Sequence, residues 1–430
     1  MAATRPGRPP GRHRRSPESQ ATYTEVIAIG EFRALWAGQC LSLLGDQLAQ
    51  IALALLVFDR TGSPFATAAV YALTYLPPIL GGPLLAGLAD RYARRRVMIV
   101  CDLLRAALVG LMAVPGVPFP LLCGLVFSVV LLSSPFTAAR AALLPEILEG
   151  DRYVAGSALQ NITNQGVQML GFAAGAGMIA TIGAHRGLAV DALTFLCSAL
   201  ILVIGVRRRP SPPAEDDVQA SLWSMTRTGV RLVFGDRRLR TLVLFAWLCG
   251  FYVLPEGIAV PYAATLSDDP RGVTLISGLL MAAMPTGTVI GAFMYSRLVT
   301  PAGRLRGMGW MAMLSCAPLI ACAVRPPLAV VLSLWILAGM GGAYQLAANA
   351  AFVRLVPAAR RGQAFGLVQS GLLAAQGIGI LAGGAAAQIL GPEPVVALAG
   401  AAGLSVAVLL AMLWTESRAE IITKVRTQVT

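Results

Sequence analysis

Between two long apolar runs the chain reads Ala86-Gly87-Leu88-Ala89-Asp90-Arg91-Tyr92-Ala93-Arg94-Arg95-Arg96. Charged residues are confined to short connections of this kind, since the chain of 430 residues is 56% hydrophobic and only 13% charged. A soluble globular protein carries about 25% charged residues. A bilayer core needs about 20 apolar residues per helix, and backbone polar groups inside it must be satisfied within the segment. Apolar runs rich in Ala, Leu and Gly therefore predict membrane-spanning helices.

The apolar runs predict an all-α integral membrane protein with twelve transmembrane helices. The expected spans are residues 32–58, 64–89, 96–115, 119–142, 153–182, 187–206, 239–266, 273–297, 305–324, 327–354, 362–391 and 393–415. Pro and Gly occur within several of these spans, which membrane helices tolerate. The spans fall into two groups of six, an N-terminal bundle in residues 31–206 and a C-terminal bundle in residues 239–416.

Three segments lie outside the expected bundles. Residues 1–30 are basic and rich in Pro, which predicts a disordered tail, and residues 417–430 form a second tail. Residues 207–238 are the longest connection, a polar linker followed by apolar residues among arginines. This second part predicts an amphipathic helix at the membrane surface. Its apolar residues are Leu222, Trp223, Met225, Val230, Val233 and Phe234.

Arginines predict the orientation of the chain. The even-numbered connections between spans carry most of them, in clusters such as residues 94–96 and 207–209, whereas the odd-numbered connections carry one each or none. Cytoplasmic loops of membrane proteins hold the excess of Lys and Arg. Both termini and the 207–238 connection are therefore expected in the cytoplasm, with the protein in the plasma membrane of a bacterium.

Composition and motifs exclude several classes of function. A net charge of +13 would suggest nucleic acid in a soluble protein, but here the arginines lie at helix ends, so no nucleic-acid partner is expected. The seven cysteines form no CxxC pair, and we expect neither a metal site nor a cofactor. The sequence has no Gly-x4-Gly-Lys-Ser/Thr loop, no HExxH and no Gly-x-Ser-x-Gly. This argues against an ATP-driven pump and against an enzyme.

The two halves of the chain resemble each other at an offset near 209 residues. Ala138–Ala142 matches Ala347–Ala351 at this offset. Two Gly-x3-Gly pairs are related in the same way, and such pairs let helices approach closely. The pairs are Gly171 with Gly175, and Gly379 with Gly383. Repeated halves with a binding site between them are a common plan of transporters.

The connection at residues 86–96 resembles the hallmark loop of the major facilitator superfamily, a small residue followed by Leu-Ala-Asp-Arg and a basic cluster. The wider first half is similar to the drug:proton antiporter branch that includes macrolide and siderophore (enterobactin) exporters. The residues that carry this likeness are Phe32–Gln39, Ser42–Asp46, Thr61–Pro64, Asp102–Arg105, Ala139-Arg140 with Leu144-Pro145-Glu146, and Asp191-Ala192 with Phe195. The chain departs from the family at Ala86 and Ala93, where Gly is usual, and at Phe172, where exporters have Pro.

The resemblance implies a major facilitator fold of two pseudo-symmetric six-helix bundles that works by alternating access. It also implies that Asp90 latches the two halves together in the outward-facing state, with Arg91 and Arg94 in the same gating loop. The simpler alternative is that this loop only anchors the topology. For the Gly-x3-Gly pairs the resemblance implies a hinge face, whereas plain helix packing is the alternative.

Charged residues inside the spans are the strongest candidates for function, because each costs about 2.5–3.5 kcal/mol at the bilayer centre. Asp46 lies near the middle of the first span. Burial disfavours the ionised form of a carboxylate, so we expect Asp46 to take up and release a proton or to bind a cationic substrate. A buried Asp bonded to neighbouring Ser or Gln is the alternative. Glu256, between Pro255 and Gly257 in the seventh span, is the second candidate.

Other polar residues within the spans could form ion pairs, line a cavity or bond between helices. Asp102 and Arg105 are three apart and can pair on one helical face, and Arg140 could pair with Asp90 or Asp102. Uncharged polar residues are expected to line a water-filled cavity or, alternatively, to bond between helices. The cavity candidates are Asn161, Asn164, Gln165, Gln168, Gln345 and Asn349.

The sequence therefore predicts a secondary transporter that exports a hydrophobic or amphipathic small molecule, such as a drug, antibiotic or siderophore, in exchange for protons. The expected partners are the lipid bilayer, the small-molecule substrate and protons, and the expected oligomeric state is a monomer. An importer of a small metabolite and a non-transporting membrane sensor are the alternatives on the same fold. Carboxylates in the middle of the membrane argue against the sensor.

Overall fold

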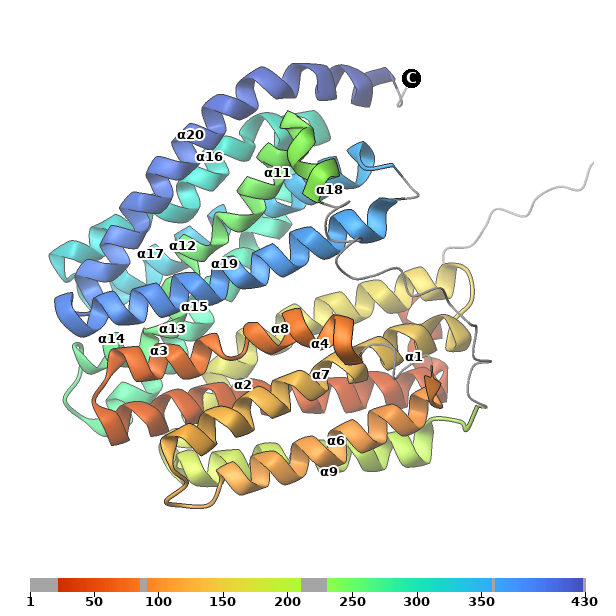
Figure 1. The fold of residues 1–430 in the computed structure, drawn as a ribbon, viewed down its shortest axis with the longest axis vertical. Helices are drawn as coiled ribbons and strands as arrows, with labels where there is room; N and C mark the ends of the chain where they lie inside the picture. Colours follow the sequence, from red (N-terminus) through yellow and green to blue (C-terminus); the bar gives the residue numbers. More distant parts are fainter. Residues whose placement is uncertain (1–21, 86–90, 210–229, 358–359, 428–430) are drawn as a thin grey trace, which may run out of the picture.

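The computed structural model of the protein describes residues 22–85, 91–209, 230–357 and 360–427. Throughout these residues the secondary structure is helical, without a strand. Figure 1 shows two helical bundles lying side by side, with the first half of the chain in one and the second half in the other. Asp90 lies outside the described residues, as do Leu222, Trp223 and Met225 of the 207–238 connection.

The first bundle contains six membrane-crossing segments preceded by a short helix. These are α1 (Tyr23–Ala28), α2 (Gly30–Thr61), α3 (Pro64–Ala72) with α4 (Leu76–Leu85), α6 (Arg94–Met112), α7 (Phe119–Ile147), α8 (Asp151–Ile182) and α9 (Ala184–Gly205). The second crossing is the pair α3 and α4, which a turn separates at Leu73. Tight connections such as Gly62 and Gly183, both at positive φ, join consecutive crossings because glycine adopts that conformation without strain.

The second bundle repeats this plan with more breaks. Its elements are α11 (Arg237–Trp247), α12 (Cys249–Tyr252), α13 (Leu254–Gly257), α14 (Ala259–Ala264), α15 (Pro270–Leu298), α16 (Pro301–Ile320) with the 3₁₀ turn η1 (Ala321–Val324), α17 (Leu328–Gly341), α18 (Tyr344–Leu355), α19 (Arg361–Leu390) and α20 (Pro392–Thr427). The four helices α11 to α14 form one crossing, and α17 with α18 forms another. The prediction of twelve crossings in two bundles of six is confirmed.

Nine of the twelve crossings are, among the described residues, long and apolar enough to span a membrane by length and composition alone. The other three all belong to the first bundle. The pair α3 and α4 is interrupted, α6 begins with three arginines, and α8 carries Asn and Gln along its first half. The polar residues of α6 and α8 must be satisfied by contacts between helices or by water.

The structure differs from the predicted boundaries at the ends of the bundles. α1 lies within the segment predicted as a tail, and α20 runs to Thr427 rather than ending near residue 415. No Pro or Gly follows Gly403 in the sequence, so nothing in the chain terminates that helix early. Residues 230–235 are helical, with Val233 fully buried and the Phe234 ring 6.0 Å from that of Trp247.

Breaks in the seventh crossing follow from Pro and Gly. Pro255 lies in the first turn of α13 and Gly257 is its last residue. Pro lacks the backbone donor of a continuing helix, and Gly costs conformational entropy. Both Gly250 and Gly257 lie where α19 approaches so closely that a side chain would not fit, against Ala375 and Ile380 respectively. The short helices thus hold the seventh crossing tightly against α19.

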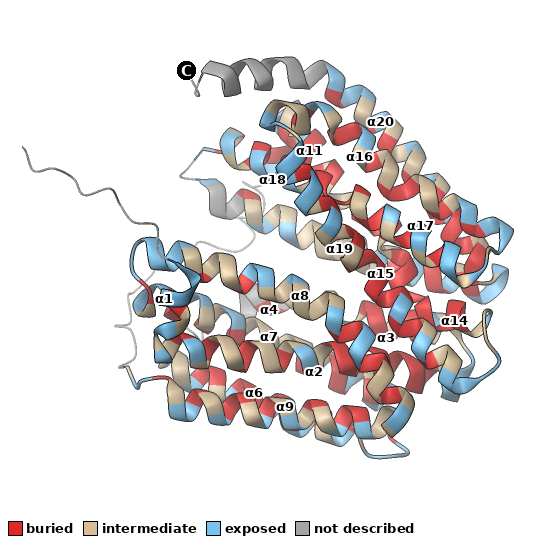
Figure 2. Ribbon diagram, turned by 180° about the vertical axis from the view of Figure 1, so that it is seen from behind, coloured by how far each residue is buried: buried red, intermediate tan, exposed pale blue. Residues whose placement is uncertain are grey.

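The most extensive contacts between the two bundles are those of α15 with α8 and of α19 with α3, and α13 and α14 also touch the first bundle. The closest approaches are Gly278 against Ala176, and Gly384 against Ala68. In Figure 1 the bundles meet near α3, α13 and α14 and separate toward the end that carries α1 and α18. Buried residues gather at the meeting end, whereas α8 and α19 are largely intermediate or exposed along the diverging part (Figure 2).

Candidate functional site

A cavity of about 790 Å³ lies between the two bundles. The second bundle supplies most of its wall, from α11, α12, α13, α15, α18 and α19, while α8 and the turn after α3 supply the rest. Its polar lining residues are Tyr75, Gln165, Gln168, Tyr252, Glu256, Thr288, Gln345, Asn349, Gln369 and Gln376. The remaining lining is aliphatic or aromatic. A cavity whose lining mixes polar and apolar groups suits an amphipathic small molecule.

Glu256 is the charged residue among the described residues that line the cavity. The broken seventh crossing presents it from α13, where its side chain is buried, with 8% of its surface exposed. The Tyr71 hydroxyl of α3 donates to Glu256 Oε2 at 3.2 Å, and the Tyr71 ring lies 6.0 Å from that of Tyr75. This hydrogen bond joins the first bundle to the second at the end where they meet. Glu256 therefore contacts both the cavity and the opposite bundle.

Four of the six polar residues predicted for the cavity line it. Gln165, Gln168, Gln345 and Asn349 do so, and the Gln345 amide donates to the Tyr252 hydroxyl at 2.6 Å. The other two lie elsewhere. Asn164 turns toward α2 and accepts a hydrogen bond from Gln39 Nε2 at 2.7 Å. Asn161 is exposed, one helical turn before Gln165 on α8, and is not among the described lining residues.

Asp46 does not line this cavity but lies inside the first bundle, 29% exposed. Arg105 Nη2 donates to both of its oxygens, Oδ1 at 2.9 Å and Oδ2 at 3.3 Å. The predicted partner of Arg105 was Asp102, which is more distant, with 4.0 Å between Arg105 Nη1 and Asp102 Oδ1. Neither a Ser nor a Gln bonds Asp46 in the described residues. Its partner instead comes from α6, far along the chain.

Asp46 belongs to a larger buried cluster formed by α2, α6 and α9. Ser198 donates to Asp102 Oδ2 at 2.7 Å, and the Arg105 guanidinium stacks 4.0 Å from the centre of the Phe195 ring. Asp191 is buried, and its carboxylate lies against Gly45, the residue that precedes Asp46. Three of the sequence stretches that carry the family likeness thus meet here. The cluster holds three carboxylates, those of Asp46, Asp102 and Asp191, and one guanidinium.

The remaining charged candidates are Arg140 and the residues of the gating loop. Arg140 makes no hydrogen bond or ion pair with any described residue, and Asp102 is taken by Ser198 and Arg105. Arg91 is exposed, its guanidinium 6.0 Å from the Tyr92 ring centre. The latch predicted for Asp90 falls outside the described residues.

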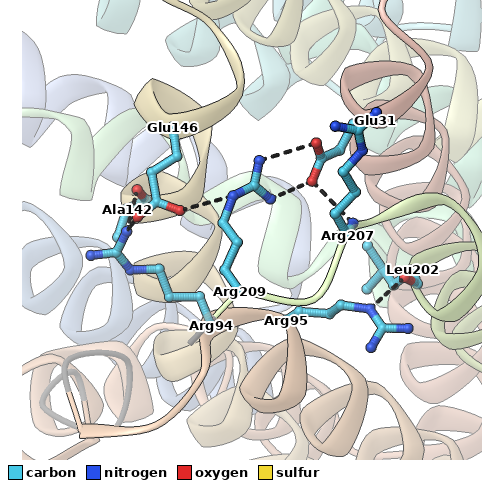
Figure 3. A network of polar contacts seen from close by, with 8 residues as sticks. All are labelled: Glu31, Arg94, Arg95, Ala142, Glu146, Leu202, Arg207 and Arg209. Carbon is cyan, nitrogen blue, oxygen red and sulfur yellow. Dashed lines mark hydrogen bonds and ion pairs between the residues drawn. The ribbon is translucent and has the colours of Figure 1, made fainter. Parts of the chain in front are cut away.

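Arg94 belongs to a network of charged residues that the sequence analysis did not foresee (Figure 3). It pairs with Glu146 near the end of α7 and donates to the Ala142 carbonyl at 3.0 Å. Arg209, at the start of the connection between the bundles, pairs with Glu31 and lies 3.4 Å from Glu146 Oε2. The network therefore fastens the first linker residues to the starts of α2 and α6 and the end of α7.

The predicted Gly-x3-Gly pairs lie within bundles rather than between them. Gly171 and Gly175 pack α8 against α2, while Gly379 and Gly383 pack α19 against α12 and α13. The close contacts between bundles are instead made by Gly278 and Gly384, which lie outside any Gly-x3-Gly pair. The alternative of helix packing therefore describes these four glycines better than the hinge face.

The sequence of this chain matches a family model over most of its length. The model described as the Major Facilitator Superfamily matches residues 35–277 and 256–428. The chain belongs to the major facilitator superfamily. The resemblance noted for residues 86–96 is thereby confirmed. This major facilitator is a multi-pass membrane transporter, with the lipid bilayer and a small-molecule substrate as its partners.

Curated relatives include drug efflux proteins. The multidrug efflux pump Tap of Mycolicibacterium fortuitum is 28% identical over 377 residues, which cover 84% of this chain and 88% of that protein. Macrolide efflux protein A of Streptococcus pyogenes is 35% identical over 77 residues, or 18% of this chain and 19% of that protein.

Solved structures of the same fold include transporters of other kinds. The nucleoside transporter NupG superposes with a TM-score of 0.66 at 15% identity, covering 89% of this chain and 98% of that one. The peptide transporter POT in complex with sulfate superposes with a TM-score of 0.69 at 16% identity, covering 93% and 99%. At this level of identity the likeness is one of fold alone.

Proposed function

We propose that this major facilitator exports a hydrophobic or amphipathic small molecule, such as a drug or an antibiotic, in exchange for protons. The observation that carries the proposal is the cavity of about 790 Å³ with Glu256 on its wall. The names of the efflux relatives support the direction of transport. Substrate and proton would each stabilise one of two states of the transporter, which is what alternating access requires.

Glu256 is the proposed point where proton and substrate compete. It faces the cavity and accepts a hydrogen bond from Tyr71 of the opposite bundle. When protonated, the carboxyl group keeps an oxygen for Tyr71 and carries no charge in the cavity. When ionised, it attracts a cationic group on a substrate. A cationic substrate in the cavity would therefore displace the proton.

Asp46 is the proposed second proton site, within the charged cluster of the first bundle. Three carboxylates and one guanidinium cannot all be ionised in a low-dielectric region without a net charge of about −2, which is costly to bury. At least one carboxylate of the cluster is therefore expected to hold a proton. Asp46 is the most exposed of the three, so it exchanges protons with water most readily.

The proposal includes the orientation of the chain in the membrane and its oligomeric state. The arginine-rich end, which carries Arg94, Arg95 and Arg209, is assigned to the cytoplasm by the positive-inside rule, so both termini are cytoplasmic. The bundles separate toward that end, which corresponds to an inward-facing state. We propose a bacterial plasma membrane and a monomer, with residues 207–238 as a cytoplasmic linker.

Uptake into inverted vesicles tests this function. A proton gradient, acidic inside, should drive accumulation of at least one compound from a panel of macrolides, siderophores and cationic dyes, and a protonophore should abolish it. Asp46→Asn and Glu256→Gln should each stop gradient-driven accumulation. If no compound accumulates in response to the gradient, the proposal of proton-coupled export is wrong.

A further inference from the structure

A second pocket, of about 170 Å³, lies between α15, α16 and α18. Two arginines line it, Arg304 from the first turn of α16 and Arg354 from the last turn of α18. The rest of the wall is mainly apolar, with Leu305, Leu346 and Ala350 among its residues. No carboxylate is among the described residues that line it. The pocket thus combines two positive charges with an apolar wall.

Arg304 is held in a fixed position by the end of α15. Its Nε donates to the carbonyl oxygens of Tyr295 at 3.0 Å and Val299 at 2.9 Å, and its Nη2 donates to that of Ser296. These carbonyls lie in the last turn of α15 and just after it, where the helix leaves such groups unsatisfied. These carbonyls carry no formal charge, so they hold the guanidinium without forming an ion pair, and its Nη1 donates no hydrogen bond to a described residue.

Arg354 is the second positive group and is less constrained. Its side chain is exposed, and it makes no hydrogen bond or ion pair within the described part of the chain. Two guanidinium groups that share one small pocket repel each other unless an anion lies between them. A planar guanidinium binds phosphate oxygens through two parallel hydrogen bonds, which makes arginine well suited to phosphate groups.

The equivalent place in the first bundle contains its own anion. There the first residue of α6, Arg94, pairs with Glu146 near the end of α7. At the repeat offset of 209 the position of Glu146 corresponds to Leu355, and Arg354 precedes it. At the same offset Arg304 corresponds to Arg95, the second residue of α6, so the second bundle also has an arginine in the first turn of its helix, but it has Leu355 where the first bundle has the carboxylate of Glu146. The missing negative charge is what an outside ligand would supply.

We propose that the pocket bounded by Arg304 and Arg354 binds a phosphate group, either that of an anionic lipid headgroup or free phosphate. The pocket lies at the arginine-rich end of the bundle, which the proposed orientation places at the cytoplasmic surface of the membrane, where lipid phosphates meet a protein. Its apolar wall suits the carbon chain next to a headgroup phosphate. Bound there, the phosphate joins the start of α16 to the end of α18 as Glu146 joins α7 to α6.

The test uses the purified full chain in a nonionic detergent, with unfolding temperature as the readout. The probes are dihexanoyl phosphatidylglycerol, dihexanoyl phosphatidylcholine and inorganic phosphate. A saturable rise in Tm with phosphatidylglycerol but not phosphatidylcholine identifies the headgroup as the source. A rise with inorganic phosphate that the lipids do not exceed identifies free phosphate. No saturable rise with any of the three overturns the proposal.

Variants connect the binding to the pocket. Arg354→Gln should raise the apparent Kd at least about tenfold, the loss expected for one hydrogen bond to a charged group. Arg354→Lys keeps the charge but cannot form two parallel hydrogen bonds, so its apparent Kd should lie between those of the wild type and Arg354→Gln. The matched control is Arg297→Gln, an exposed arginine in the last turn of α15 that does not line the pocket. Equal affinity in wild type, Arg354→Gln and Arg297→Gln would overturn the assignment.

A charge reversal separates loss of binding from loss of folding. Arg354→Glu would recreate in the second bundle the ion pair that the first bundle has between Arg94 and Glu146. This variant should keep or raise its Tm without ligand and no longer respond to phosphatidylglycerol or phosphate. A variant that still responds like the wild type contradicts the proposal.

Discussion

The two bundles hold their membrane carboxylates in different ways. In the first bundle Asp46, Asp102 and Asp191 surround one guanidinium, and the cluster lies among α2, α6 and α9 away from the central cavity. In the second bundle Glu256 has no cationic partner among the described residues, and lines the cavity. A paired carboxylate is stabilised in its charged form, whereas an unpaired one next to a cavity can respond to what enters it. The contrast assigns a structural role to the first site and substrate recognition to the second. Because three carboxylates share one guanidinium, the first site can also hold a proton.

The largest effect is expected from removing the only guanidinium of the cluster. Arg105→Leu leaves the three carboxylates without their counter-charge, and removing one partner of a buried ion pair costs about 3–5 kcal/mol. We expect a large drop in Tm and in the yield of folded protein. Arg297→Leu, which removes an exposed arginine, is the control and should change stability by only about 0.5 kcal/mol. Equal Tm values for the two variants would show that the cluster does not stabilise the bundle.

Glu256→Gln is expected to have the next largest effect, on transport rather than on folding. The amide oxygen can still accept from Tyr71, so Tm should change little, but the variant cannot ionise. Gradient-driven accumulation should fall at least about tenfold, which corresponds to about 1.4 kcal/mol. Glu393→Gln is the matched control, since Glu393 is also buried but lies 3.7 Å from Arg325 and does not line the cavity. Comparable transport loss in both variants would remove the special role of Glu256.

Asp46→Asn should separate the roles of the two bundles. Asp46 lies outside the cavity, so the affinity for substrate should change less than about twofold, while accumulation driven by the proton gradient should be lost. Equilibrium binding and vesicle uptake measured on the same variant test this. A substrate affinity that falls as far as in Glu256→Gln would place Asp46 in the binding site instead.

Tyr71→Phe is expected to have the smallest effect, because it removes one hydrogen bond between the bundles. A net contribution of about 1 kcal/mol shifts the ratio of the two states about fivefold toward the one in which the bundles separate at that end. Spin labels at the exposed positions Thr61 and Leu390, in a background without native cysteines, report this through their distance distribution. An unchanged distribution would show that the hydrogen bond does not hold the bundles together.

Much of the fold could be predicted because the bilayer restricts backbone structure to helices of known length. Glu256 could be predicted as a candidate because it is a charged residue within a predicted span, whereas the break of that span at Pro255 and Gly257 was not predicted. The partner of Asp46 could not be predicted, because Arg105 reaches it from another helix and sequence spacing pointed to Asp102. The same limit applies to Tyr71 with Glu256. Contacts between segments far apart in the chain depend on packing angles that local patterns do not encode.

The glycines at helix contacts also show that sequence spacing does not identify packing partners. The regular spacing of Gly171 with Gly175 indicated a close helix contact, and one exists, but within a bundle. Gly278 and Gly384 allow the contacts between bundles and have no pattern around them that distinguishes them from other glycines in an Ala-rich membrane protein. The identity of a packing partner is a property of the three-dimensional arrangement.

Proton release on substrate binding tests the competition at Glu256 most directly. A compound that accumulates in the inverted vesicles is added to detergent-solubilised protein in weakly buffered solution, and the pH is followed. The account predicts that the wild type and Glu393→Gln release protons on binding, and that Glu256→Gln releases none. Undiminished proton release from Glu256→Gln would contradict the account.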